Sequence, residues 1–194
     1  MKQRISRLGK GIFAALAAAA VLVAGALTAT EVSAGDDHKQ HKKSHPTGLV
    51  KTVLTETRMF RDVNEAMAQG YGLFLGCVSS PHEGAMGVHY VNGGLVGDGM
   101  LDAAHPEALV YEPRRGQLKL VAVEYVVLAD AWHSSNEQPP TLDGQVFNYV
   151  GNPNRYGLPA FYELHVWAWK ENPHGTFSDH HPRVSCDDYS ADEQ

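Results

Sequence analysis

Alternation and helical spacing of apolar residues predict most elements of this chain. Residues 53–70 place apolar side chains at helical spacing between charged ones, and predict one long amphipathic helix. Residues 108–112 and 117–128 are apolar runs on either side of the turn sequence PRRG, and predict a hairpin. Residues 161–169, FYELHVWAW, are rich in aromatic and β-branched residues and predict another strand. Shorter strands are expected at 84–92 and 145–150.

These elements favour one fold class. Strand patterns outnumber helical ones after residue 84, and the hairpin favours antiparallel pairing. We therefore predict an α+β fold, with an N-terminal helix packed on a mostly antiparallel, curved sheet that could close in a barrel-like form. The predicted single domain covers residues 47–186, and residues 187–194 form an acidic C-terminal tail.

The strand at 161–169 has one purely apolar face and one mixed face. With a period of two, Glu163 and His165 lie on the mixed face among Phe161, Trp167 and Trp169. Burying a carboxylate beside an imidazole is costly unless both are hydrogen-bonded or bound to something. This face therefore carries the main functional signal of the sequence.

Two other strands carry a polar residue at mid-length. His89 has the small neighbours Ala85 and Gly87 on its own face, and Glu124 shares its face with Leu120, Ala122 and Val126. A curved sheet could bring these residues to His165, and two histidines with one carboxylate form the ligand set of many zinc and non-haem iron sites. We predict a divalent-metal site, for zinc, iron or copper, at His89, Glu124 and His165, with Glu163 as a partner or alternative ligand.

The loop after residue 169 supplies secondary candidates for the same site: His174, Asp179, His180 and His181. The spacing is not diagnostic, because the sequence has no HExxH, HxH or CxxC motif. Two alternatives therefore stay open. Hydrogen bonds alone could satisfy the strand residues in a non-catalytic structural or interaction protein. A small apolar ligand could instead occupy a cavity lined by aromatic residues, for which the candidates are Tyr90, Tyr125 and Trp167.

The beginning of the chain has the pattern of an export signal. Four basic residues precede the apolar run 12–28, and Val32-Ser33-Ala34 predicts cleavage after residue 34. The expected signal peptide is 1–34 and the expected location is secreted or periplasmic, with an uncleaved anchor as the alternative. Residues 35–46, GDDHKQHKKSHP, predict a disordered His-rich tail that could bind metal weakly.

Charge excludes some classes of partner. Removal of the leader, which holds four basic residues and one acidic residue, leaves 12 basic and 21 acidic residues, a net charge of −9 with neutral histidines. This balance disfavours nucleic acid and anionic membranes, so the expected partner is a metal ion or a small molecule. The chain has neither a GxSxG elbow nor a phosphate-binding glycine loop, and whether it is an enzyme stays open.

The chain has two cysteines, Cys77 and Cys186, and both follow the leader. In an oxidising compartment an even pair is most simply a disulfide, here between the start and the end of the domain. A thiolate nucleophile or a metal thiolate is the alternative, but neither has its flanking signature.

Several segments together resemble an uncharacterised family of secreted bacterial proteins. The resemblance covers about residues 61–186 and lies in the segments RDVNEA, GVHYVN, ALVYEP, LVAVEYVV, ELHVWAWKENPHGTF and VSC. It implies export and one compact domain, and it assigns no functional residue.

Overall fold

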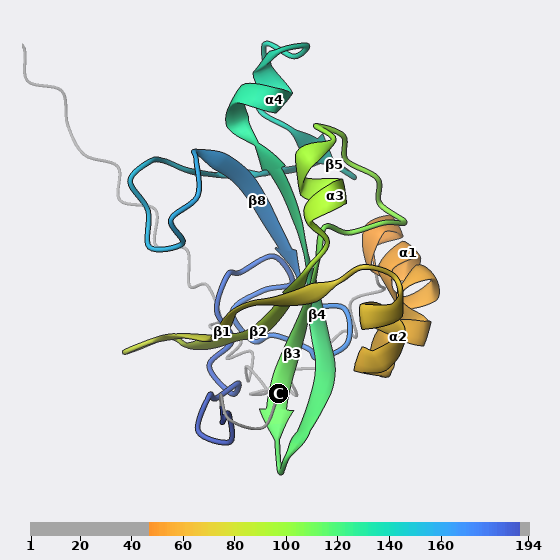
Figure 1. Cartoon of the computed structure of the whole chain (residues 1–194), viewed down its shortest axis with the longest axis vertical. Coiled ribbons are helices and arrows are strands. Elements are labelled where there is room, and N and C mark those ends of the chain that lie inside the picture. Colours follow the sequence, from red (N-terminus) through yellow and green to blue (C-terminus); the bar gives the residue numbers. More distant parts are fainter. Residues whose placement is uncertain (1–46, 191–194) are drawn as a thin grey trace, which may run out of the picture. The chain divides into compact units, whose positions relative to one another are not determined.

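The computed structural model describes residues 47–190, which all belong to one compact unit. The predicted α+β class is confirmed, because short helices pack against a curled antiparallel sheet that forms a half-barrel (Figure 1). The predicted signal peptide at 1–34, the predicted tail at 35–46 and the last four residues of the predicted acidic tail lie outside the described residues.

The main sheet has six strands, and every neighbouring pair in it is antiparallel. In spatial order these are β1 (Gly72–Ser80), β2 (Gly84–Val91), β3 (Ala108–Arg114), β4 (Gln117–Leu128), β8 (Phe161–Val166) and β7 (Asn148–Val150). A separate ribbon pairs β5 (Thr141–Leu142) with β6 (Gln145–Val146). The predicted hairpin is the β3–β4 pair, whose turn residues Arg115 and Gly116 both have positive φ, the geometry that suits the twist of paired strands.

The single long helix predicted at 53–70 is wrong, because the segment forms three short helices. These are α1 (Gly48–Glu56), the 3₁₀ helix η1 (Arg58–Arg61) and α2 (Val63–Ala68). Asp62 interrupts the segment, because its carboxylate accepts a hydrogen bond from the Asn64 backbone and starts a new helix. Two further one-turn helices, α3 (Gly93–Gly97) and α4 (Ala129–His133), flank the sheet. None of the helices among the described residues is long and apolar enough to cross a membrane.

The two faces of the sheet are covered differently. We call the face packed against α1, η1 and α2 the helix face, and it holds the larger core, which includes Val53, Phe60, Val123 and Leu164. We call the opposite face the loop face. It holds a smaller core in which sheet residues pack with the C-terminal segment: Ala85, Val110, Val121, Ala122, Trp167 and Val184.

Two local irregularities change the predicted faces. In the β3–β4 register Val110 pairs with Ala122 and Tyr111 with Leu120, so one extra residue on β4 forms a bulge and turns Leu120 to the helix face. The prediction that Leu120 shares the face of Glu124 is therefore wrong. Trp169 also lies on the helix face, because β8 ends at Val166 and the chain turns sharply there.

The predicted disulfide is present. Cys77 on β1 is bonded to Cys186, with their Cα atoms 5.8 Å apart, and it ties the C-terminal segment to the edge of the sheet. Disulfides persist in oxidising compartments, so this bond is compatible with the predicted export.

Candidate metal centre

Register and sheet curvature bring three polar side chains together on the loop face. Glu124 on β4 lies directly opposite His165 on β8, so their side chains point to the same face. His89 comes from β2, two strands from β4, yet its Nε2 lies 3.4 Å from Oε2 of Glu124. Nδ1 of His165 lies 3.9 Å from Oε1 of the same carboxyl. One ligand atom from each residue lies within 4.8 Å of the other two, as predicted.

The intervening strand explains how His89 reaches Glu124. Two strand spacings amount to about 10 Å in a flat sheet. Side chains that stand perpendicular to a flat sheet would therefore be too far apart for direct contact. On β3, Ala108 pairs with Glu124 and Val110 pairs with His89, and both β3 residues are fully buried. The short Ala108 side chain and the curl of the sheet leave room for the imidazole and the carboxyl to meet above β3.

The three side chains are buried with few polar partners. His165 is 0 % exposed, His89 6 % and Glu124 7 %. Among the described residues, none hydrogen-bonds to either ring nitrogen of His165, and Nδ1 of His89 has no well-aligned partner, although the Gly87 backbone lies near this ring. Buried polar atoms in native proteins nearly always have a partner, and each unpaired one costs about 1–3 kcal/mol. These nitrogens therefore require a partner that the described side chains do not supply.

Burial keeps both imidazoles neutral. It lowers the pKa of His89 to about 4, and nearby His180 acts in the same direction while the Gly87 backbone opposes it. Burial lowers the pKa of His165 well below its usual value, and the charges of His89 and His180 add to this. Neutral imidazole is the form that coordinates a metal ion, so no proton has to leave these rings at neutral pH.

The carboxyl groups shift in the opposite direction. Burial raises the pKa of Glu124 well above its usual value, and the adjoining Glu163, which is hydrogen-bonded to it, raises it further. Burial also raises the pKa of Glu163, to about 7. The His89–Glu124 contact has ion-pair distance, but both pKa shifts favour a neutral imidazole beside a protonated carboxyl, so we describe it as a neutral pair. A bound cation would favour the ionised carboxylate.

Of the four secondary candidates, Asp179 and His180 adjoin the group. Oδ1 of Asp179 lies 4.0 Å from Nδ1 of His165 and accepts a hydrogen bond from Asn148. His180 faces Glu83 with Nδ1, at 3.7 Å, and its buried Nε2 has no hydrogen-bond partner among the described residues. Neither belongs to the set of residues that lie within metal-binding distance of one another.

The other two secondary candidates lie apart from the group. His174 is exposed. His181 is fully buried, but both of its nitrogens are engaged: Nδ1 accepts from the Arg183 backbone and Nε2 donates to the Glu171 carbonyl, each at 3.0 Å. His181 forms an antiparallel bridge with Ala85, whereas the imidazole of its neighbour in sequence, His180, faces Glu83.

A cavity of about 390 Å³ opens beside the candidate ligands His89, Glu124 and His165, which we call the metal group. His89, Glu124 and Glu163 form its polar part, and most other lining residues are apolar. The predicted lining by Tyr90, Tyr125 and Trp167 is wrong, since the two tyrosines lie on the helix face and none of the three lines the cavity. Its aromatic lining consists instead of Phe74, Tyr156 and Phe161. Sequence patterns could not identify Tyr156, which lies outside any strand.

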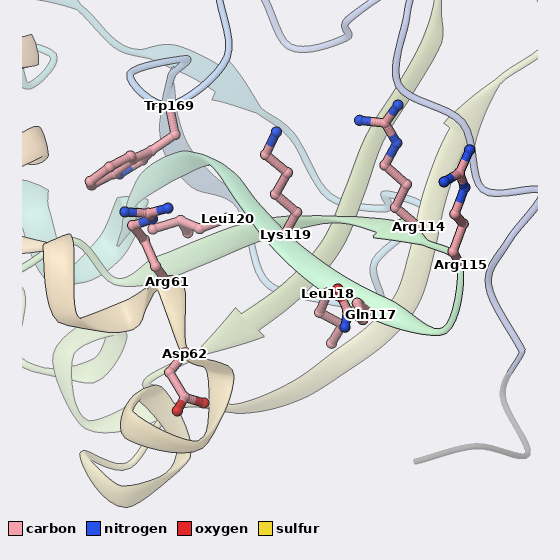
Figure 2. A pocket seen from close by; sticks show the side chains of 9 residues that line it. All are labelled: Arg61, Asp62, Arg114, Arg115, Gln117, Leu118, Lys119, Leu120 and Trp169. Atoms are coloured by element: carbon pink, nitrogen blue, oxygen red, sulfur yellow. The ribbon is translucent and has the colours of Figure 1, made fainter.

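A larger and shallower depression lies at the β3–β4 hairpin. Figure 2 shows Arg61 beside the Trp169 ring at one end, Arg114 and Arg115 at the other, and Lys119 between them. The fold thus gathers basic residues that are scattered in the sequence. None of the buried polar atoms of residues 47–190 that lack a hydrogen-bond partner belongs to this depression. The depression therefore lacks the unpaired buried atoms that distinguish the metal group.

Comparison with known proteins adds no further constraint: no family model, curated protein or solved structure matches this chain. The resemblance to a family of secreted bacterial proteins therefore stays a prediction.

Proposed function

We propose that the protein binds one divalent transition-metal ion through His89, Glu124 and His165. The observation that carries this proposal is the buried imidazole pair, whose ring nitrogens largely lack hydrogen-bond partners although they lie beside a carboxyl group. Coordination would satisfy these atoms and offset the cost of burying them.

The donor set favours particular metals. Two imidazoles and one carboxylate suit zinc and ferrous iron, and such three-ligand sites leave coordination positions for water or substrate. Hard cations such as calcium prefer oxygen ligands alone. Glu163 is hydrogen-bonded to Glu124 and would fix the orientation of that ligand, as outer partners of metal ligands commonly do. The open positions would support either metal carriage or metal-assisted chemistry.

The test is a metal titration of untagged full-length protein in which the tail residues His38, His41 and His45 are replaced by Asn. After removal of metal with EDTA, we expect one cobalt(II) or zinc(II) ion per chain, followed by cobalt absorbance and by zinc competition. The His89→Ala/His165→Ala double variant should bind more than about 100-fold more weakly, since even outer partners of metal ligands contribute 10–100-fold.

The matched control is His174→Ala, which removes an exposed histidine outside the group. It should bind metal as the parent protein does. Binding of equal strength to the parent and the double variant would contradict the proposal, as would a parent protein that binds no metal.

A further inference from the structure

We infer that the cavity beside the metal group binds a small, neutral and largely apolar molecule whose one oxygen or nitrogen donor reaches the metal. The donor part of this inference rests on the proposed metal binding, whereas the apolar part does not.

The lining is apolar except at one end. Eleven of the lining residues are aliphatic, Met or Phe: Leu73, Phe74, Leu75, Val78, Met86, Val91, Val96, Val126, Leu128, Leu158 and Phe161. Tyr156, which also lines the cavity, directs its phenol hydroxyl to Sδ of Met86 at 3.8 Å. A mainly apolar pocket with a few convergent polar groups is the usual form of a small-molecule site.

The volume limits the size of the occupant. A closed apolar cavity of about 150 Å³ accommodates benzene. The cavity here, about 390 Å³, is large enough for a molecule of about two aromatic rings.

The charge of the polar end limits the chemistry. His89, Glu124 and Glu163 supply the titratable groups of the lining, Asp179 lies close by, and none of the lining residues is lysine or arginine. With a divalent ion bound, the carboxylate of Glu124 and the adjoining Glu163 offset most of the positive charge of the ion, so an anionic ligand would lose its hydration without meeting a strongly cationic partner. A neutral donor such as a hydroxyl, carbonyl or imidazole avoids this cost.

The edge strand β1 has an irregular backbone where it lines the cavity. Its register with β2 shifts between Phe74 and Cys77, where Leu75 and Gly76 have φ of 61° and 66°. Positive φ is strained for leucine, and such strain is characteristic of functional sites. Leu73 and Leu75 both line the cavity yet are 45 % and 51 % exposed. The bulge thus presents apolar side chains at an open entrance instead of burying them.

The probe for the apolar part is N-phenyl-1-naphthylamine, a neutral molecule whose fluorescence rises in apolar surroundings. The test variant is Gly97→Trp, since Gly97 lines the cavity and a Cβ added there meets no atom within 4 Å. The matched control is Gly151→Trp, outside the cavity, where the nearest atom to a Cβ lies at an ordinary 3.8 Å. We expect Gly97→Trp to weaken probe binding about tenfold or more and Gly151→Trp to change it less than about twofold, where tenfold corresponds to about 1.4 kcal/mol.

The donor part is tested by displacing this probe with 4-phenylimidazole. In zinc-loaded protein the displacement should need about tenfold less 4-phenylimidazole than in metal-free protein, and the anionic 3-phenylpropionate should gain less from zinc than 4-phenylimidazole does. Equal probe affinity in the two tryptophan variants would overturn the inference whether or not metal binds. A second outcome would overturn the donor part alone: Gly97→Trp weakens probe binding and the protein binds zinc, but zinc does not improve displacement by 4-phenylimidazole. Failure of the parent protein to bind zinc would contradict the proposed function. The probe result would then still decide whether the cavity binds an apolar molecule.

Discussion

Buried polar groups on the two faces of the sheet differ in whether they have hydrogen-bond partners. On the helix face, Tyr71, Tyr111 and Tyr125 each donate a hydroxyl hydrogen bond of 2.7 Å to a backbone carbonyl. On the loop face, His165 is equally inaccessible to solvent but has no hydrogen-bond partner among the described residues. The hydroxyl groups of these helix-face tyrosines thus have partners within the protein, whereas the ring of His165 does not, and the proposed metal ion would supply its partner.

The same contrast exists within the loop face. His181 and His165 are both 0 % exposed, and both lie among apolar residues. Backbone groups of Arg183 and Glu171 satisfy the two nitrogens of His181, because a turn in the C-terminal loop wraps around its ring. His165 lies on β8, whose backbone pairs with β4, and no group of the described residues hydrogen-bonds to its ring nitrogens. Burial alone therefore does not distinguish a candidate ligand histidine; His165 differs from His181 in lacking hydrogen-bond partners and in lying within metal-binding distance of His89 and Glu124.

The sharpest test of this comparison replaces each buried histidine by leucine. His165→Leu should lower metal affinity by more than about 100-fold and leave the unfolding free energy of metal-free protein unchanged or higher, because it removes unpaired polar atoms. His181→Leu should keep metal affinity within about threefold but lower the unfolding free energy by about 1–3 kcal/mol, because two part-buried hydrogen bonds to backbone groups are lost. Metal titration and urea denaturation in EDTA measure the two effects.

The two variants serve as controls for each other. If His181→Leu abolished metal binding in a protein that remained folded, the C-terminal loop would belong to the metal centre. If His165→Leu destabilised metal-free protein by several kcal/mol, His165 would have a structural role that its observed contacts do not explain.

The sequence was informative wherever backbone periodicity alone decides the position of a residue. Glu124 and His165 lie at mid-length in apolar strands, so strand pairing could bring them together, and the mixed face of residues 161–166 was correctly expected. The pairing of Cys77 with Cys186 needed only the count of cysteines and the export signal.

The sequence was not informative where side-chain hydrogen bonds or bulges decide the path of the chain. Asp62 divides the N-terminal helix, and an extra residue on β4 reverses the face of Leu120. His181 could not be distinguished from His165 by residue type or surroundings, because its partners come from backbone turns that leave no periodic pattern. The lining of the cavity was missed for the same reason, since Tyr156 and Leu158 belong to an irregular segment.

Glu107 gives a second, smaller test, because it is a buried carboxyl that has a partner. It is 2 % exposed and accepts a hydrogen bond of 3.0 Å from the Val126 backbone, and burial raises its pKa from 4.5 to about 8, with smaller effects in the same direction from Asp98 and Asp102. The folded state therefore binds this proton more tightly than the unfolded state does. The resulting stability is fully present below pH 4.5 and is lost as the pH rises through about 8.

We expect Glu107 to contribute a fall of a few kcal/mol in the unfolding free energy of the metal-free protein between pH 5 and 8, since one pKa unit corresponds to about 1.4 kcal/mol. Glu107→Gln keeps an acceptor for the Val126 amide and should make this fall less steep. The exposed Glu137→Gln should leave it unchanged. Urea denaturation at a series of pH values in EDTA measures the slopes, and parallel slopes for Glu107→Gln and the parent protein would refute the assignment.

The smallest expected effect compares one tyrosine from each face. Tyr111 donates to the Phe60 carbonyl at 2.7 Å and joins β3 to η1, whereas the Tyr156 hydroxyl contacts only the weak acceptor Sδ of Met86, at 3.8 Å, among the described residues. Tyr111→Phe leaves a buried carbonyl without its donor and should lower the unfolding free energy by about 1 kcal/mol, and Tyr156→Phe by less than about 0.5 kcal/mol. Urea denaturation of metal-free, disulfide-bonded protein resolves this difference if the m-values stay equal. Equal losses for the two variants would mean that the hydroxyl groups of both faces are satisfied to the same degree, and the distinction between the two faces would then rest on His89 and His165 alone.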